Sequence, residues 1–254
     1  MFARELARRG ADLVLVARSE GKLAALADEL SASHGVAADV AVADLAEPSA
    51  ASELAESLLA RDLQIDILVN NAGFGLFALV YQADSAVLAD MVRVNVGALV
   101  DLTRLYLPGM VERDHGAIIN VGSTAGFQPV PHMAVYGATK AFVLSFTEAL
   151  WAETRGTGVR VTALCQGSID TGFFDVAGED AQVGRRIAPE RVVQAAFRAL
   201  DRRSSTVVTG GLESWMLTNS SRLAPRQLVA RIAERTMRPN KGGRQAEKAL
   251  TEQR

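Results

Sequence analysis

The sequence predicts an α/β fold, a doubly wound parallel sheet in a single domain. Six short runs of branched apolar residues alternate along the chain with stretches of helical periodicity. The runs are 12–17, 36–43, 65–70, 116–123, 159–165 and 205–209. This alternation is typical of parallel strands covered by helices on both faces. Gly10 and Gly35 fall where the first two helices should end.

Size, charge and composition exclude several classes of protein. A chain of 254 residues is long enough for one α/β domain, and its net charge of −2 provides no field that would attract nucleic acid. The single Cys165 lies in an apolar run, which predicts a buried structural thiol and a reducing, cytoplasmic compartment. His34, His115 and His132 are scattered, so no metal site is expected.

The elements that follow the first strands carry the polar residues of interest. Helical stretches are expected at about 2–9, 85–110 and 134–157, and the two longest carry Asn95 and the pair Tyr136 and Lys140. Gly116 to Ser123 is an apolar run that stops at small residues, which predicts a buried strand. Ser123 would therefore stand at the carboxyl end of a strand, where open α/β sheets bind their ligands.

The segment from Ser123 to Lys140 brings a hydroxyl, a phenol and an amine together. Tyr136 and Lys140 are four residues apart, so they share one face of a helix. A neighbouring ammonium favours the phenolate, which predicts that Lys140 lowers the pKa of Tyr136 below its ordinary value of about 10. This pattern indicates a proton donor and acceptor for general acid–base catalysis.

Four motifs occur in one order: N-N-A-G at 70–73, Asn95 in R-V-N-V-G, Ser123, and Tyr136-x-x-x-Lys140. Together they resemble the short-chain dehydrogenase/reductase family, from the first residue to about Thr209. The resemblance implies a Rossmann-type fold and an NADP(H)-dependent oxidoreductase that interconverts a carbonyl and an alcohol. It also implies a homodimer or homotetramer, because two long helices of the family pair across a two-fold axis.

The resemblance implies a role for each catalytic residue. Tyr136 would exchange a proton with the substrate oxygen, and Ser123 would hydrogen-bond that oxygen as charge develops. Lys140 would hold the nicotinamide ribose and lower the pKa of the tyrosine, and Asn95 would position a water that relays protons to Lys140. The substrate is expected to be a small-molecule carbonyl or alcohol of apolar character.

The cofactor contacts implied by the resemblance are spread over the strand ends. They are Arg18, Asp44, Leu45, Asn71, Ala72, Gly73, Tyr136, Lys140, Gly167, Ile169 and Thr171. Ala17 stands where an NAD site would have an acid, and the guanidinium of Arg18 can pair with a 2′-phosphate, so NADP is favoured over NAD. The simpler interpretation is that Arg18 faces solvent beside a helix start.

An apolar substrate pocket is predicted from residues in the loops around the reaction centre. Its candidates are Phe74, Phe127, His132, Phe173 and Phe174. Aromatic side chains in such loops also serve packing, and they do not identify a substrate. Steroids, acyl chains and aromatic ketones remain open.

The beginning of the chain departs from the family pattern. A fold of this type begins with a strand and a glycine-rich turn that hold the pyrophosphate. Residues 2–10 resemble the helix after that turn, so we expect the first strand to be absent from this chain and encoded upstream. In the family's order that strand lies between those ending at Ala17 and Asn70, and two rows of backbone groups would lack partners without it.

Residues 1–222 are expected to form the dinucleotide-binding and catalytic domain. Residues 223–238 are expected to form a basic amphipathic helix that docks on its own domain, with contact to a membrane surface or a partner as the alternative. Residues 239–254 are expected to be a mobile tail. The alternative function is a non-catalytic relative that acts as a dimerising scaffold.

Overall fold

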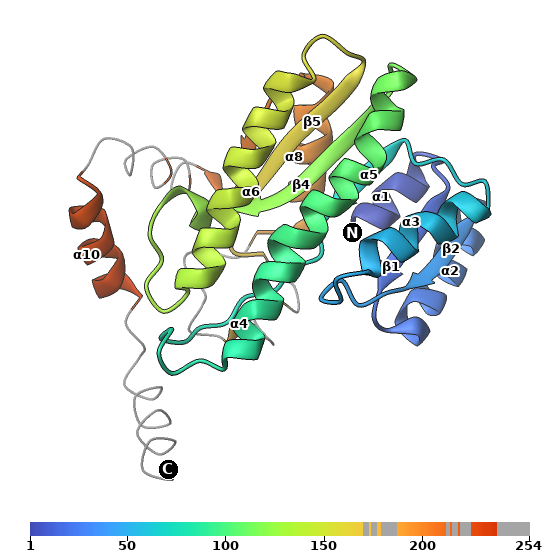
Figure 1. Cartoon of the computed structure of the whole chain (residues 1–254). Helices are drawn as coiled ribbons and strands as arrows, with labels where there is room; N and C mark the ends of the chain where they lie inside the picture. Colours follow the sequence, from blue (N-terminus) through green and yellow to red (C-terminus); the bar gives the residue numbers. More distant parts are fainter. Residues whose placement is uncertain are drawn as a thin grey trace.

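Helices cover both faces of parallel strands in this protein (Figure 1). The computed structural model describes residues 1–169, 173, 177–178, 187–211, 214, 218 and 225–237. The strands are β1 (Leu13–Ala17), β2 (Ala38–Val42), β3 (Ile67–Asn70), β4 (Gly116–Ser123), β5 (Val159–Gln166) and β6 (Thr206–Val208). The helices are α1 (Phe2–Arg8), α2 (Glu20–His34), α3 (Ala50–Ala60), α4 (Ser85–Val92), α5 (Ala98–Glu112), α6 (Ala134–Glu153), α8 (Pro189–Asp201) and α10 (Arg226–Thr236). The predicted α/β fold and its six strands are confirmed.

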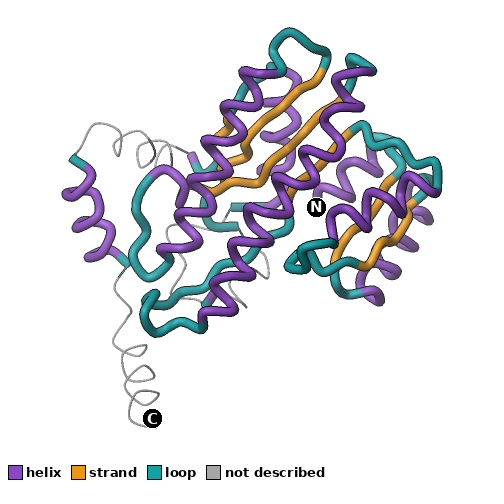
Figure 2. Tube along the Cα trace, in the orientation of Figure 1, coloured by secondary structure: helices purple, strands orange, loops and turns teal. Residues whose placement is uncertain are grey.

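The strands form two separate sheets, which are visible as two groups in Figure 2. β1 pairs in parallel with β2, and β3, β4, β5 and β6 pair in parallel in that order. Among the described residues, β1 has only β2 as a neighbour and β3 has only β4. The carboxyl ends of β3, β4 and β5 lie side by side, since Asn70 pairs with Asn120 and Ser123 pairs with Gln166.

Alternate residues of the strands pack against two different helical layers. Leu13 and Leu15 of β1 lie in a cluster with side chains of α1, α2 and α8. Val14 and Val16 pack instead against α3 and α5. β4 is buried along its whole length, as expected for a parallel strand between two layers. These layers confirm the doubly wound arrangement.

The long helical stretch expected at 85–110 is interrupted. α4 ends at Val92, a π-helical turn follows over Arg93–Gly97, and α5 begins at Ala98. Asn95 lies inside the π-helical turn. Single turns of this kind are frequent at functional sites, and apolar periodicity alone does not predict them because the apolar face continues through the turn.

The predicted amphipathic helix near the carboxyl terminus corresponds to α10. Ala233 and Met237 are buried, whereas Leu228 and Ile232 are exposed. The side of α10 with Ala233 and Met237 therefore faces the rest of the protein. The domain boundaries proposed from the sequence remain predictions. The predicted tail 239–254 lies outside the described residues. Within those described ranges, none of the helices is long and apolar enough to cross a bilayer.

Candidate active site

Ser123 and Tyr136 meet at the carboxyl end of β4. Ser123 is the last residue of β4, and its Oγ accepts a hydrogen bond of 3.1 Å from the N–H of Ala125. Tyr136 lies in the first turn of α6 and is 9% exposed. The Ser123 side chain also hydrogen-bonds the phenol, which by itself lowers the pKa of Tyr136. The two predicted catalytic residues are therefore neighbours.

Lys140 follows one turn after Tyr136 on the same helix, as the spacing predicts. Its Nζ donates a hydrogen bond of 2.7 Å to the carbonyl oxygen of Val121 in β4. The same nitrogen lies 5.8 Å from the centre of the Tyr136 ring. The carbonyl of Val121 thus fixes the position of the ammonium beside the aromatic ring.

The pKa shifts in this site run opposite to the sequence-based prediction for the tyrosine. Burial raises the pKa of Tyr136 to about 12, against the smaller effect of the Ser123 hydrogen bond. Burial also lowers the pKa of Lys140 to about 8. The prediction that the pKa of the phenol is lowered is wrong for this structure, because the effect of removal from water exceeds that of the Ser123 hydrogen bond. Tyr136 is consequently protonated at neutral pH.

Asn95 reaches the site from the π-helical turn and is 1% exposed. Its Oδ1 accepts from the N–H of Phe74 at 3.0 Å, and its Nδ2 donates to the carbonyl of Phe74 at 2.9 Å. A Cβ on Gly73 would lie 2.9 Å from the Oδ1 of Asn95 and 3.6 Å from the Nζ of Lys140. Glycine is therefore needed at position 73 so that the loop after β3 can approach both side chains.

Thr139 is a site residue that the sequence analysis missed. Its Oγ1 accepts a hydrogen bond of 3.1 Å from Asn95 and donates one of 2.7 Å to the carbonyl of Tyr136. It is 4% exposed and lies between the two halves of the motif Tyr136-x-x-x-Lys140. A small hydroxyl directly before the motif's lysine was the only signal in the sequence that could have identified it.

A second buried polar chain runs beneath the site. The Nδ2 of Asn70 donates to the Oδ1 of Asn120 at 2.9 Å and to the Oγ1 of Thr103 at 3.2 Å. The Nδ2 of Asn120 donates to the Oγ1 of Thr147 at 3.0 Å. These contacts join α5, β3, β4 and α6, which are the elements that carry or flank the predicted catalytic residues. The first asparagine of N-N-A-G thus has a packing role.

Arg18 and Asp44 are brought together from the ends of β1 and β2. Their closest side-chain atoms, Nη1 and Oδ2, are 3.7 Å apart, and the side chain of Arg18 is 77% exposed. Asp44 also accepts a hydrogen bond of 3.0 Å from the N–H of Ala46. Leu45 packs partly buried against the cluster under α3. An exposed guanidinium at a strand end can still reach an anionic ligand.

The remaining predicted cofactor residues are distributed around the same edge. Asn71, Ala72 and Gly73 are exposed after β3, and Ile169 is buried with a parallel bridge to Ile187. Gly167 is half-buried after β5, while Thr171 lies outside the described residues. The structure therefore brings the exposed backbone of 71–73 next to Lys140 and leaves the contribution of Thr171 a prediction.

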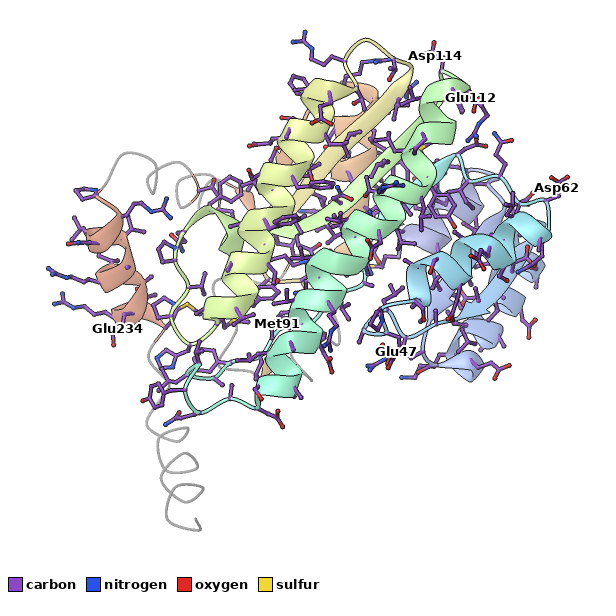
Figure 3. The ribbon with its side chains drawn as sticks, in the orientation of Figure 1. Glu47, Asp62, Met91, Glu112, Asp114 and Glu234 are labelled. Carbon is purple, nitrogen blue, oxygen red and sulfur yellow. The ribbon has the colours of Figure 1, made fainter. Side chains whose placement is uncertain are left out.

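An apolar wall lies beside Tyr136. It is the cluster of Met91, Val130, Met133, Tyr136, Ala177 and Met237, with Phe74, Leu76, Phe77, Leu88, Ala125, Val135 and Phe173 packed against it. The ring centres of Tyr136 and Phe173 are 5.3 Å apart. Met91, labelled in Figure 3, contributes from α4 and is fully buried. Phe173 thus lies beside the Tyr136 ring and Phe74 packs against the same cluster, while their role in a substrate pocket stays a prediction.

Two other predicted pocket residues have different surroundings. His132 stacks on Phe77 with ring centres 5.1 Å apart, and its backbone has a φ of 63°. Phe127 packs against a separate cluster with Leu144 and Cys165, so its place in the pocket remains a prediction. Phe174 lies outside the described residues. Cys165 is fully buried and its pKa is raised by burial to about 12, which confirms a structural thiol.

These residues fit a dinucleotide at two of its ends. The exposed guanidinium of Arg18 suits a ribose phosphate or hydroxyl. The amine of Lys140 lies close to exposed Gly73, and an amine there can donate to a ribose hydroxyl. Among the described residues, no group of three histidine, cysteine, aspartate or glutamate side chains could hold a metal ion. The fold and the site together define a Rossmann-type oxidoreductase.

Comparison with known proteins identifies the family. Residues 1–182 match the family described as short chain dehydrogenase. The chain belongs to the short-chain dehydrogenase family, whose members are oxidoreductases acting on CH–OH groups.

Named relatives and solved structures agree with this assignment. The chain is 38% identical over 206 residues to the NADP-dependent 3-hydroxy acid dehydrogenase YdfG of Escherichia coli strain K12, covering 77% of this chain and 82% of that protein. It is 33% identical over 209 residues to the very-long-chain 3-oxoacyl-CoA reductase of Anas platyrhynchos, covering 81% of this chain and 66% of that protein.

Among solved structures, a short-chain dehydrogenase from Sphingobium yanoikuyae in complex with NADPH is 34% identical, with a TM-score of 0.78. The match covers 87% of this chain and 88% of that one. Both this complex and the NADP-dependent dehydrogenase agree with the prediction that NADP is favoured.

Proposed function

We propose that this protein is an NADP(H)-dependent oxidoreductase that interconverts a carbonyl and an alcohol at Tyr136. The observation that supports it best is the convergence of four polar side chains at one sheet edge. Ser123, Tyr136, Lys140 and Asn95 come from a strand end, one helix and a π-helical turn, and each is at most 9% exposed. Burying that many polar groups costs stability unless they are paired, and function explains why it is tolerated.

In reduction, the protonated phenol of Tyr136 gives its proton to the substrate oxygen, and in oxidation the phenolate takes it back. The raised pKa of Tyr136 keeps the phenol protonated at neutral pH, which is the form that reduction requires. Ser123 donates its hydroxyl hydrogen to the same oxygen as negative charge develops there. When bound, NADPH supplies the hydride to the carbonyl carbon and NADP⁺ receives it from the alcohol.

Lys140 and Asn95 support that proton transfer. The ammonium of Lys140 is held by the carbonyl of Val121 and faces the exposed loop at Gly73, where it would hold the ribose hydroxyls of the dinucleotide. Asn95 fixes the loop at Phe74 and is itself fixed by Thr139. We assign Thr139 as a positioning residue, because its hydroxyl links Asn95 to the backbone of Tyr136.

The adenosine end of the cofactor supports NADP over NAD. Ala17 provides no carboxylate for a ribose 2′-hydroxyl, and the guanidinium of Arg18 next to it is exposed and can form paired hydrogen bonds with a 2′-phosphate. Asp44 would contact the adenine, and its ion pair with Arg18 keeps the guanidinium at this edge.

The substrate class we propose is a 3-oxoacyl or 3-hydroxyacyl compound with an apolar chain. Two named relatives act on substrates of this type, a 3-hydroxy acid and a very-long-chain 3-oxoacyl-CoA. The apolar wall of Phe74, Met133 and Phe173 lies beside Tyr136 and suits a hydrocarbon chain next to the reacting carbonyl.

Nicotinamide fluorescence tests this function directly. The 254-residue chain is titrated with NADPH, and oxidation of NADPH is then followed with ethyl acetoacetate and with longer 3-oxoacyl esters. Micromolar binding and ester-dependent oxidation are expected. Tyr136→Phe should lose at least a thousandfold in kcat while it still binds NADPH, because only the transferred proton is removed. Normal turnover by Tyr136→Phe would exclude the phenol from this role.

A non-catalytic scaffold that acts by association is the alternative. The same titration distinguishes it from the enzyme. A scaffold would bind no NADPH and would oxidise no NADPH with any of the esters. Its state of association would also be unaffected by NADPH. Self-association is measured on the same sample by light scattering. A homo-oligomer that also turns over NADPH agrees with the enzyme, because family members pair through their long helices.

A further inference from the structure

A cavity of about 250 Å³ lies at the amino end of β5, close to where α6 and α8 end. In Figure 1 the end of α6 and the start of β5 meet at the top of the view. The candidate active site lies at the other end of β5, where Gln166 pairs with Ser123. Eight residues of extended strand span roughly 23 Å, so this cavity is distinct from the candidate active site.

Three guanidinium groups contribute to the lining of this cavity. They belong to Arg155 after α6, Arg160 in β5 and Arg203 after α8. Among the described residues, no acidic side chain lines the cavity. The wall between the arginines is aromatic and apolar, and it is formed by Trp151, Val159 and Val161. We refer to this space as the arginine cavity.

Two of these arginines have little or no compensating negative charge. The guanidinium of Arg155 lies 5.2 Å from the centre of the Trp151 ring, and it forms neither an ion pair nor a hydrogen bond with a described residue. Arg160 lies 3.6 Å from the carboxylate of Asp201, whose side chain is 68% exposed. Water can therefore reach both members of that pair, and an incoming anion can compete for Arg160.

Arg203 is held in place by its neighbours. Its φ is 51°, which lies in the left-handed region that asparagine and glycine adopt more readily than arginine. Its carbonyl accepts a hydrogen bond of 2.8 Å from the indole N–H of Trp151. Its Nη1 donates one of 3.1 Å to the carbonyl of Thr157. A guanidinium has five N–H donors, so most of those of Arg203 remain available for a ligand.

A simpler interpretation is that these arginines only complement the carboxyl ends of two helices. The contact of Arg203 with the carbonyl of Thr157 agrees with that interpretation. It does not account for Arg155, whose guanidinium reaches no described carbonyl and lies instead at the Trp151 ring. An unpaired cation beside an aromatic ring, with two further guanidinium groups around the same space, is better suited to a bound anion.

We propose that the arginine cavity binds an organic phosphate monoester that carries an aromatic ring. The phosphate would lie between Arg155, Arg160 and Arg203, since guanidinium groups form paired hydrogen bonds with phosphate oxygens. The ring would pack against Trp151 and the two valines. Three arginines and one neighbouring aspartate leave about two positive charges, which match the charge of about −2 on a monoester near neutral pH.

The proposal does not depend on the enzymatic activity. None of the residues that line the arginine cavity belongs to the candidate active site, and the two sites lie at opposite ends of β5. A failure to find oxidation of NADPH would leave this proposal intact, and a failure to bind a phosphate monoester would leave the proposed activity intact.

Isothermal titration with phenyl phosphate at pH 7.5 and low salt tests the proposal. We expect a Kd below about 1 mM for the 254-residue chain. Benzoate has the same ring but a single charge, and inorganic phosphate lacks the ring, so each should bind about tenfold more weakly. The indole N–H signal of Trp151 should shift in ¹⁵N NMR spectra during the titration with phenyl phosphate. That signal is identified by its absence in Trp151→Phe.

Two variants remove single guanidinium groups from the cavity. Arg155→Ala should weaken the binding of phenyl phosphate about tenfold, because one paired contact is lost. Arg203→Gly should have a similar effect, and glycine accepts the φ of 51° and keeps the carbonyl that binds Trp151. Arg198→Ala is the matched control, since Arg198 is exposed on α8 and does not line the cavity. Its Kd should be that of the wild type.

Three results would overturn the proposal. The first is that phenyl phosphate does not bind, or that benzoate or inorganic phosphate binds as tightly. The second is equal weakening by Arg198→Ala and Arg155→Ala, which would mean a general effect of charge. The third is that Arg18→Ala abolishes binding while Arg155→Ala and Arg203→Gly do not change it, which would assign the phosphate to the opposite edge of the protein.

Discussion

The region of β1 and β2 and the region of β3 to β6 use polar side chains in opposite ways. Five of the eight ion pairs among described residues lie within residues 1–62, and apart from Glu5 their side chains are at least 37% exposed. Every buried polar or charged side chain among described residues lies at Asn70 or later. We refer to these regions as the charged half (residues 1–62) and the catalytic half (residues 63–211).

The difference matches what each half has to do. The catalytic half contains Lys140 and Asn95, whose amine and amide are held in one geometry by hydrogen bonds inside the protein. Preorganised dipoles act most strongly where water is excluded. The charged half instead presents Arg18 in water, where binding a phosphate requires little desolvation of the protein. Under the proposed function, the chemistry would lie in the catalytic half and recognition of the phosphate in the charged half.

The largest effect is expected from Lys140→Met in the catalytic half. Turnover should fall at least a thousandfold, while the free energy of unfolding at pH 7 should rise by about 2 kcal/mol. The pKa of Lys140 is about 8 in the folded protein against an ordinary 10.5, so below about pH 8 the folded state bears the full cost of burying the charge. Losing the bond to Val121 offsets about 1 kcal/mol of the gain.

Urea unfolding at two pH values checks that sign. The unfolded chain binds more protons than the folded one between pH 8 and 10.5, so the wild type gains stability from this group as the pH rises through that window. The advantage of Lys140→Met should therefore shrink at pH 10. A variant that is less stable than the wild type at pH 7 would contradict the burial penalty. NADPH binding by the wild type should weaken as the pH rises above about 8.

Arg18→Ala tests the charged half. NADPH binding should weaken about tenfold, which corresponds to roughly 1.4 kcal/mol, and NADH binding should hardly change, because only the 2′-phosphate loses its partner. Both constants are measured by nicotinamide fluorescence. Arg61→Ala is the matched control, since Arg61 also pairs with an exposed aspartate, Asp39, in the same half. Equal weakening of NADPH and NADH by Arg18→Ala would argue for a general effect of charge.

Thr139→Val sharpens the distinction between positioning and catalysis. We expect kcat to fall about tenfold with the KM for NADPH unchanged, because Asn95 loses one acceptor while Lys140 keeps its contact with Val121. Thr139→Ser keeps the hydroxyl and should restore most of the activity. If Thr139→Ser is as slow as Thr139→Val, the methyl group and its packing would be responsible instead of the hydrogen bond.

The smallest effect is expected from Glu5→Gln on α1. Hydrogen bonds from Arg8 and then Arg9 lower the pKa of Glu5 to about 2, so its contribution to stability is present above the ordinary value of 4.5 and is lost as the pH falls toward 2. At pH 7 the variant should lose less than about 1 kcal/mol, as is usual for surface pairs. Urea midpoints at pH 7 and pH 3 check this, with Glu56→Gln on α3 as the control. A difference that grows at pH 3 would contradict it.

Much of the fold and the identity of the central residues could be predicted from local patterns. The apolar runs mark all six strands to within two residues, because a strand buried on both faces needs apolar side chains along its whole length. Gly10 and Gly35 have φ values of 79° and 69°, in the left-handed region that glycine accepts at helix ends. The spacing of Tyr136 and Lys140 placed both on one face of α6.

Other features depend on contacts that no local pattern carries. Packing between separate elements produces three of them. They are the π-helical turn at Asn95, the hydrogen bond from Asn95 to Thr139, and the hydrogen bond from Asn70 to Asn120. The pKa of Tyr136 was predicted in the wrong direction, because spacing reveals the neighbouring charge but not the depth of burial. The division of the described strands into two sheets likewise depends on pairing between distant segments, which the apolar runs do not reveal.

The sequence by itself determined the periodicity of the elements and which chemical groups this protein has available. Those properties follow from side-chain shape and from spacing along the chain, which act over a few residues. Only the tertiary structure decided how far each group is removed from water, which partners it has and which strands pair with each other. These properties depend on contacts between residues far apart in the chain, and burial changes the energy of a charge or an unpaired amide by several kcal/mol.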